Sequence, residues 1–364
     1  MWITSSLSTA RTPSVIALGN FDGVHLGHRE VIQPILNLGD RSIAEIPAGI
    51  SSSVLNSTFL AAVQGYSACN GQLIETTSDN SSQTAPGCQD RSVRSYVTVL
   101  TFFPHPQEFF SGQSRPLLTT LDEKVLQLKS MGVEQLVLLP FNRKLAELSP
   151  QAFVETVLIQ KLQARHISVG VDFRFGHRRA GSSEDLRAFA TAYEIPVTIV
   201  PLKFYDDERI SSSRIRQALQ TANLLQAEQL LGRPYSLTGR VIKGQQLGRT
   251  LGFPTANLKL PPEKFVPRNG VYSVKVYGLT TNSNASPLPG VMNIGYRPTV
   301  DGQTQTIEVH LLNWSGDLYG QTLTVSLEAF LRPEQKFDSL DSLKVQIQRD
   351  CEAATTRLMV GDRS

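Results

Sequence analysis

The segment Gly19-Asn20-Phe21-Asp22-Gly23-Val24-His25-Leu26-Gly27-His28 decides the fold of this chain. It follows the apolar run 15–18, which predicts a buried strand. Apolar residues then recur at helical spacing, at Val31, Ile32, Ile35 and Leu36. The segment is therefore predicted to be a strand-to-helix turn. Its glycines let the backbone pass close to a phosphate, and the free N–H groups of the helix start attract an anion.

Two histidines, His25 and His28, lie three residues apart in this turn. The spacing brings both imidazoles to one place, where they can stabilise a phosphate that gains charge as it is attacked. A glycine-rich turn with one capping histidine is the alternative that this segment alone leaves open.

The segment resembles the HxGH signature of the nucleotidyltransferase superfamily. With Phe-Asp-Gly before it, it is similar to the bacterial bifunctional riboflavin kinase/FMN adenylyltransferase (FAD synthetase) family. The resemblance implies phosphorylation of riboflavin by ATP to FMN, and adenylylation of FMN by a second ATP to FAD, with Mg²⁺ as cofactor. It implies catalytic roles for His25 and His28. It also implies nucleotide contacts at Gly19, Phe21, Asp22 and Gly23.

Length and composition restrict the class of protein. The chain has 364 residues, which suggests two domains, and its net charge of +3 is too small to argue for nucleic acid. Its three cysteines have no metal-binding spacing and suit a reducing cytosol. We find no signal peptide and no apolar run near the roughly 20 residues of a membrane span. A cytoplasmic enzyme of small molecules is expected, without nucleic acid or membrane partners and with its oligomeric state open.

In the first half, predicted strands alternate with predicted helices, which indicates a doubly wound parallel sheet with helices on both faces. The predicted strands are 15–18, 96–102, 135–139, 167–171 and 197–201. Helices are expected at 121–131, after the cap Ser149 and from Ser182. Ligands should collect beyond the carboxyl ends of the strands.

Three further motifs follow predicted strands. Phe103-Pro104-His105-Pro106 matches the family's TFxPHP, which implies flavin contacts by His105 and Pro106. Gly170–Gly176 matches GxDFRFG, which implies that Asp172 holds the nucleotide. Arg209–Arg216 resembles SSTxIR with a serine in place of the usual threonine. It implies triphosphate binding by Arg209, Ser212, Ser213, Arg214 and Arg216. A proline-stiffened loop and a capped amphipathic helix are the structural alternatives for the first and third motifs.

The segment 40–94 interrupts this order. It is dominated by Ser, Thr, Asn, Gln and Gly, and its short apolar patches have no sustained period. We interpret it as a largely disordered or loosely packed insertion, absent from the family's shorter connection. A regulatory or docking loop is the alternative.

The second half contains strands without intervening helices. A short helix at 223–231 precedes predicted strands at 235–241, 270–277, 291–294, 306–312 and 323–330. This pattern predicts a small antiparallel barrel, followed by a helix with apolar residues on one face. The expected domains are 1–222, which adenylylates FMN, and 223–364, which phosphorylates riboflavin.

A glycine-rich arch precedes Gly252-Phe253-Pro254-Thr255-Ala256-Asn257-Leu258. Backbone N–H groups of such an arch can surround phosphate oxygens, although the Walker A pattern is absent. The segment resembles the riboflavin kinase signature, whose PTAN element implies that Thr255 and Asn257 hold magnesium and ATP. Nucleotide contacts are implied for Gly244, Gly248, Arg249, Gly252 and Asn257. A glycine-rich barrel loop is the alternative.

In 306–312, Ile307, Val309 and Leu311 are predicted to face the core, and Glu308 and His310 the opposite side. A carboxylate there can take a proton from a primary alcohol. The segment resembles the one that carries the family's kinase base, which implies that Glu308 is the base rather than an ordinary exposed glutamate. The match at 331–337 implies that Arg332 and Phe337 border the flavin.

Two other functions stay open at this point. One is a riboflavin kinase whose first domain is inactive or regulatory, and the other is a flavin-binding or RNA-binding regulatory protein. The paired catalytic residues and the small net charge favour the bifunctional enzyme.

Replacing 40–94 with a short Gly/Ser linker should leave both activities and the melting temperature nearly unchanged. The segment's polar composition contributes little burial, and each doubling of loop length costs only about 0.6 kcal/mol. Flavin chromatography and thermal unfolding measure the outcome. Loss of FAD synthesis with the fold intact would mean that the segment takes part in adenylylation.

Overall fold

The computed structural model describes residues 1–39, 94–244, 248, 251–279, 286–299 and 302–361. The expected insertion and Arg249 lie outside this part of the chain, apart from Arg94 at the insertion's edge. Residue contacts group Met1–Asp40 and Ser95–Ser364 into one compact unit. Among the described residues, no helix has both the length and the apolarity needed to cross a bilayer.

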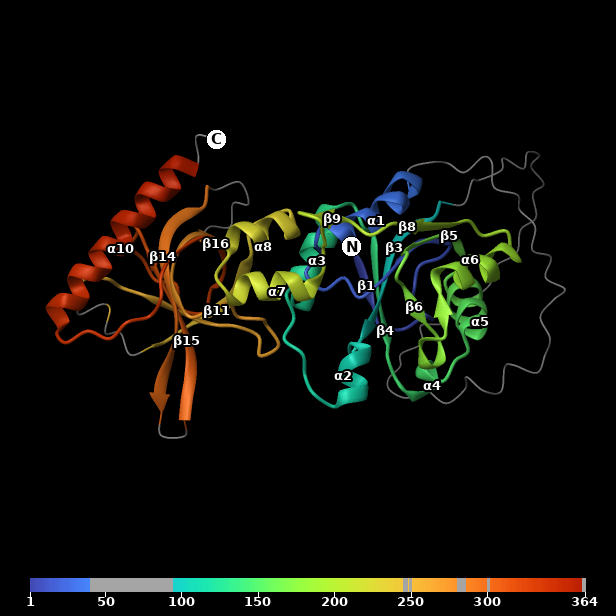
Figure 1. The fold of residues 1–364 in the computed structure, drawn as a ribbon, viewed down its shortest axis with the longest axis horizontal. Coiled ribbons are helices and arrows are strands. Elements are labelled where there is room, and N and C mark those ends of the chain that lie inside the picture. Colours follow the sequence, from blue (N-terminus) through green and yellow to red (C-terminus); the bar gives the residue numbers. More distant parts are fainter. Residues whose placement is uncertain (40–93, 245–247, 249–250, 280–285, 300–301, 362–364) are drawn as a thin grey trace, which may run out of the picture. The chain divides into compact units, whose positions relative to one another are not determined.

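The first half contains a six-stranded sheet in which every neighbouring pair is parallel (Figure 1). Its order is β1-β4-β3-β2-β5-β8. The strands are β1 Trp2–Thr4, β2 Ser14–Leu18, β3 Tyr96–Phe103, β4 Gln135–Pro140, β5 Ala164–Gly170 and β8 Val197–Val200. The chain leaves β2 toward β3 on one side and returns to β5 on the other. The carboxyl end of β2 is therefore a topological switch point, where ligands of such sheets bind.

Alternate residues of β2 pack on opposite faces of the sheet. Ile16 and Leu18 share a core with α5, η2 and α6, whereas Val15 and Ala17 share one with α1 and α3. These helices are α1 Leu26–Gly39, α3 Leu121–Ser130, α5 Pro150–Phe153, the π-helix η2 Val154–Lys161 and α6 Ser183–Thr191. Helices on both faces confirm the doubly wound fold.

Local chemistry explains where these helices begin. The Ser149 side chain accepts from the backbone N–H of Ala152, and Ser182 forms a capping box with Asp185. Two elements of the sheet and its covering helices differ from the prediction. The helix after Ser149 is α-helical only to Phe153 and then continues as a π-helix, and β1 at the sheet edge was not predicted because three residues show no period.

Short elements connect the main ones near the carboxyl ends of the strands. They are α2 Pro106–Ser111, α4 Arg143–Ala146, β6 Arg174–Phe175, η3 His177–Arg179, β7 Gly181–Ser182, β9 Phe204–Tyr205, β10 Glu208–Arg209, α7 Ser212–Gln220 and α8 Leu224–Leu231. The helix predicted at 223–231 is α8, in which Asn223 is the cap before the first turn and Gly232, with a left-handed φ of 71°, ends the helix.

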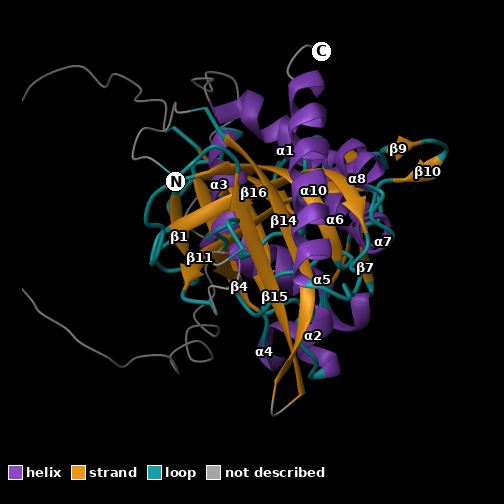
Figure 2. Cartoon of the chain, turned by 90° about the vertical axis from the view of Figure 1, so that its left-hand side faces the viewer, coloured by secondary structure: helices purple, strands orange, loops and turns teal. Residues whose placement is uncertain are grey.

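The second half is a closed antiparallel barrel in the order β11-β12-β15-β14-β13-β16. Figure 2 shows β11, β14, β15 and β16 of this barrel. The strands are β11 Ser236–Ile242, β12 Ala256–Lys259, β13 Gly270–Tyr277, β14 Leu288–Thr299, β15 Gly302–Leu311 and β16 Thr322–Arg332. This confirms the predicted barrel. The strand β12 was not predicted, because its four residues are too few to show a period.

The last helix, α10 Leu340–Gly361, packs on the outside of the barrel. Its Cys351 and Ala354 share a small core with Val271 of β13 and Val291 of β14. Arg332 at the end of β16 donates to both carboxylate oxygens of Asp350, with a shortest separation of 2.8 Å. This ion pair fixes the helix against the strand.

One apolar core joins the barrel interior to α7 and α8. It contains Ile215 and Leu230 of these helices together with Tyr272 and Met292 of the barrel, and Leu118 of the segment before α3. A boundary between residues 222 and 223 therefore stays a prediction, because α7 packs with the barrel core while its first residues line the site described next.

Candidate active sites

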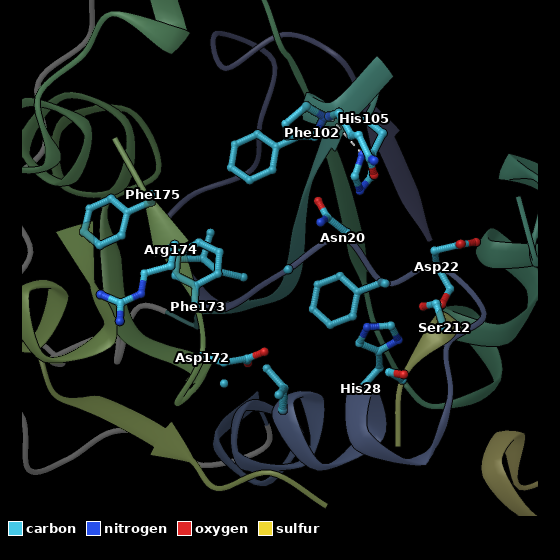
Figure 3. A pocket seen from close by; sticks show the side chains of 18 of the residues that line it. Asn20, Asp22, His28, Phe102, His105, Asp172, Phe173, Arg174, Phe175 and Ser212 are labelled. Carbon is cyan, nitrogen blue, oxygen red and sulfur yellow. Dashed lines mark hydrogen bonds between the residues drawn. The ribbon is translucent and has the colours of Figure 1, made fainter. Parts of the chain in front are cut away.

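A cavity of about 950 Å³ lies beyond the carboxyl ends of β2, β3, β5 and β8 (Figure 3). Most of the residues predicted to bind nucleotide or flavin in the first half line it. They are Gly19, Phe21, Asp22, His25, His28, His105, Pro106, Asp172, Arg209, Ser212 and Ser213. Four motifs separated by up to about 190 residues therefore meet at one cavity, as the switch-point rule predicts.

The turn that carries the histidines is strained. Phe21 and Val24 are fully buried, yet their φ angles are 51° and 42°. Positive φ is unfavourable for a β-branched residue such as Val24, and such strain persists only where the surroundings hold it in place. Here Asp22 Oδ1 accepts from the backbone N–H of Leu118 at 2.8 Å, and the Thr119 hydroxyl accepts from the Gly23 N–H at 3.0 Å.

The rings of His25 and His28 stack, with centroids 3.6 Å apart. The backbone N–H of His28 donates to Nδ1 of His25, so a neutral His25 carries its proton on Nε2. Burial lowers the pKa of His25 to about 4. Burial, followed by the neighbouring His25, holds the pKa of His28 well below its usual range. Both imidazoles are therefore neutral near pH 7.

His28 also has an unused polar atom. Its Nδ1 is buried and has no hydrogen-bond partner among the described residues. An unpaired buried polar atom of this kind is costly in free energy.

The lining of the cavity combines aromatic rings with charged groups. In Figure 3, Phe102, Phe173 and Phe175 stand across the cavity from Asn20, His28 and Ser212. Phe110, Phe141 and Phe153 also line it. Six cations face two carboxylates around the cavity, namely Arg115, Arg174, Arg178, Arg179, Lys203 and Arg209 against Asp22 and Asp172. This composition suits a ligand with both a flat aromatic ring and several phosphates.

Sequence reasoning did not assign the aromatic side of the cavity. Phe173 and Phe175 lie in a motif that the sequence analysis identified. Their alternation directly after Asp172 could have indicated that they line the cavity. Phe141 and Phe153 had no such signal in the sequence, because their approach to Phe102 depends on the packing of α5 and the loop after β4. Their ring centroids lie 5.7 and 6.4 Å from that of Phe102.

Two predicted nucleotide-binding residues contact each other. Arg209 and Asp172 form an ion pair of 2.5 Å at the cavity. Arg214 instead donates to the carbonyls of Tyr205 and Glu208, and Arg216 pairs with Asp22. These two arginines hold the β9–β10 hairpin and the histidine turn, and they do not line the cavity in this structure.

A second constellation lies on the barrel. Glu308 of β15 is in register with Asn257 of β12 on one side and Asn293 of β14 on the other. The hydroxyl of Thr255 donates to Glu308 Oε2 at 3.4 Å. Strand pairing therefore brings together the hydroxyl, the amide and the carboxylate that the sequence predicted. Ile307, Val309 and Leu311 face the core, as expected.

The glycine arch lies close to this constellation. A Cβ on Gly244 would lie 2.2 Å from the Asn257 amide nitrogen, and one on Gly248 would lie 2.4 Å from the carbonyl oxygen of Phe253. Only glycine permits these approaches without rearrangement. Gly252 has a left-handed φ of 90°. His310, which sequence reasoning left without a role, holds the motif by its Nδ1, 2.8 Å from the carbonyl oxygen of Pro254.

The residues expected to border the flavin at the barrel have structural contacts. The Arg332 guanidinium binds Asp350 and lies 5.7 Å from the centroid of the Phe337 ring. Neither side chain is brought next to Glu308 by a described contact, so their flavin role stays a prediction.

Comparisons with known proteins agree with both sites. A riboflavin kinase family model matches residues 231–358, and an FAD synthetase model matches 7–46 and 88–214. A bifunctional riboflavin kinase/FMN adenylyltransferase from Escherichia coli K12 is 38% identical over 337 residues, covering 92% of this chain and 90% of the relative. The chain belongs to this bifunctional family. The Haemophilus influenzae member is 34% identical, covering 93% of this chain and 92% of the relative.

Family membership confirms the resemblance inferred from the motifs and the predicted enzyme class. The FAD synthetase model leaves residues 47–87 unmatched, within the predicted insertion. A crystal structure titled macrolide-efflux protein, from Streptococcus pneumoniae, superposes with a TM-score of 0.74 at 27% identity. It covers 97% of this chain and 98% of its own, and it supports the fold of both halves.

The histidine pair predicts a pH dependence of stability. The folded pKa of His25, about 4, lies below its unfolded value near 6.5, so the unfolded chain binds more protons between these values. Stability should fall as the pH drops from 6.5 to 4, with no such loss at pH 7. The variant His25→Gln should lose less stability over this pH range. The melting temperature of both proteins, recorded against pH, measures the difference. Identical pH profiles for both proteins would contradict the assignment.

Proposed function

We propose that this chain phosphorylates riboflavin with ATP to give FMN, and then adenylylates FMN with a second ATP to give FAD and pyrophosphate. Curated relatives with this pair of activities span more than 90% of the chain. The observation that carries the proposal is the stacked histidine pair, at the start of α1, in a cavity lined by an excess of cations and by several phenylalanine rings.

The barrel carries the kinase reaction. The carboxylate of Glu308 takes the proton of the ribityl 5′-hydroxyl, whose oxygen attacks the γ-phosphorus of ATP as ADP leaves. Thr255 and Asn257 orient the phosphates beside this base, and the close-packed glycine arch supplies backbone N–H groups. His310 keeps the motif in place through Pro254.

The barrel residues also fit magnesium. The Thr255 hydroxyl and the Asn257 amide lie beside Glu308, and hard oxygen ligands such as these two suit Mg²⁺ that stays bound to phosphates. Within the described residues no cluster of three or more His, Cys, Asp or Glu forms a separate metal cage. When bound, the ion would neutralise charge on the transferred phosphoryl group. Magnesium use and the cytoplasmic setting expected from the composition remain part of the proposal.

The first half carries adenylyl transfer. An FMN phosphate oxygen attacks the α-phosphorus of ATP, and pyrophosphate leaves. His28 and His25, which both line the cavity, stabilise the charge that develops on the α-phosphate. Ser212, Ser213 and Arg209 line the side where the departing phosphates would lie.

The flavin ring has one chemically suitable side of the cavity. Phe102, Phe173 and Phe175 offer aromatic faces and edges to a flat ring, while His105 and Pro106 border the same cavity from the start of α2. Asp172 can release Arg209 to accept hydrogen bonds from the ribose of ATP. These placements would direct the FMN phosphate toward the histidines.

The variant His28→Ala separates adenylyl transfer from the kinase reaction. Removing this imidazole should slow FAD formation by about 10²–10³-fold, because a transition-state contact is lost. FMN formation should stay normal, so FMN accumulates when flavins are separated after incubation with riboflavin, ATP and magnesium. The matched control is His177→Ala, an exposed histidine that does not line the cavity. Unchanged FAD formation in His28→Ala would remove the histidine pair from the mechanism.

Glu308→Gln should produce the opposite pattern. The amide cannot accept the hydroxyl proton, and loss of a general base typically costs about 10²–10⁴-fold. FMN formation from riboflavin should therefore collapse, while added FMN is still converted to FAD. Glu328→Gln, a strand glutamate of β16 that hydrogen-bonds Ser326, is the control. Wild-type kinase turnover in Glu308→Gln would show that another group is the base.

A further inference from the structure

A lysine of the barrel contacts the segment that holds the histidine turn of the other site. Lys264 lies between β12 and β13, and its side chain is only 1% exposed. Its ammonium donates to the carbonyl oxygen of Leu118 at 2.8 Å and to Glu123 Oε2 at 2.5 Å. It also lies 4.5 Å from the centroid of the Tyr235 ring. Both acceptors belong to the first half of the chain.

The segment that Lys264 contacts is the one that shapes the histidine turn. The N–H groups of Leu118 and Thr119 both donate to Asp22 Oδ1, and the Thr119 hydroxyl accepts from Gly23 N–H. Leu118 thus accepts a hydrogen bond from Lys264 at its carbonyl oxygen and donates one to Asp22 from its N–H.

Backbone contacts reinforce this link. Leu117 N–H donates to the Glu263 carbonyl at 2.6 Å, and Phe265 N–H donates to the Leu117 carbonyl at 2.8 Å. Glu123 accepts from Lys264 through Oε2 and from the β11 backbone N–H of Thr238 through Oε1. The buried carboxylate is therefore bonded by two separate barrel elements.

We propose that Lys264 is a positioning residue for adenylyl transfer, so that the barrel helps to form the site in the other half of the chain. The inference rests on the proposed function. The path runs from Lys264 through Leu118 and Thr119 to Asp22 and Gly23, two residues before His25. The strained φ angles of Phe21 and Val24 need such support, which this path provides together with the Arg233 guanidinium, a donor to the carbonyls of Gly23 and Val24. A displacement of about 1 Å at reacting groups costs up to about 10²-fold in rate.

This path does not include the proposed kinase residues Thr255, Asn257 and Glu308. The kinase activity is therefore an internal control. Glu308, Asn257 and Thr255 are arranged by pairing of β12 with β15. A positioning role therefore predicts loss of one activity and retention of the other on the same chain. A general loss of stability would lower both.

The test compares Lys264→Met with wild type and with Lys259→Met, the same change at an exposed position on β12. FAD formation is measured from added FMN and ATP, and FMN formation from riboflavin and ATP, below the melting temperature of every variant. Lys264→Met should lower kcat for FAD formation about 10–100-fold, with KM values changed less than about twofold. Its kinase rate and both rates of Lys259→Met should be those of wild type.

Two more variants separate positioning from folding. Lys264→Met leaves the Glu123 carboxylate buried without its cation, which destabilises. In Glu123→Gln/Lys264→Met that charge is gone, so the melting temperature should recover while FAD formation stays low. Thr119→Val removes only the hydroxyl that binds Gly23 N–H, and it should lower FAD formation at least about fivefold with normal kinase activity.

The outcomes are distinct. Wild-type FAD formation in Lys264→Met or in Thr119→Val overturns the proposal, and so does an equal fall of both activities. Recovery of FAD formation together with the melting temperature in the double variant would reduce Lys264 to a stabilising role and also overturns it. If wild type itself makes FMN and no FAD, the proposed function fails, which is a different result.

Discussion

The carboxylate of Asp22 is the constraint on which the adenylylation site depends. One oxygen accepts from two consecutive backbone N–H groups, of Leu118 and Thr119, and the other binds the guanidinium of Arg216. Partners about 100 and 190 residues away are thereby fixed to one turn. Because charge-assisted hydrogen bonds are among the stronger ones in proteins, this carboxylate can hold a backbone that would otherwise relax.

That constraint has a chemical consequence for the histidines. A rigid turn at the start of α1 keeps the two rings stacked and buried, and burial keeps them neutral. Neutral imidazoles bring no charge of their own to the cavity, whose cations already exceed its carboxylates. They can therefore donate hydrogen bonds to a developing phosphate charge without raising the repulsion among those cations.

Much of this architecture follows from sequence pattern, and the exceptions have physical reasons. The central strand, the capped helices and the barrel strands were predicted because burial alternates or repeats locally, as in Ile307, Val309 and Leu311. The strands β1 and β12 were too short to show a period. The aromatic side of the cavity depends on residues from β3, α5 and the loop after β4 meeting in space, which no local spacing encodes. The contacts of Lys264 were invisible for the same reason, since its partners are about 140 residues away.

The two sites illustrate two ways of placing catalytic groups. On the barrel, regular strand pairing puts Glu308 beside Asn257, so a local sequence pattern is enough to predict that these two residues are neighbours. In the first half the histidines lie on a strained turn whose geometry no regular element enforces. Such a turn needs support from outside, and here the support includes residues of the barrel. For a site on a strained turn, a sequence motif can therefore identify the residues. Only tertiary contacts explain why these residues keep their geometry.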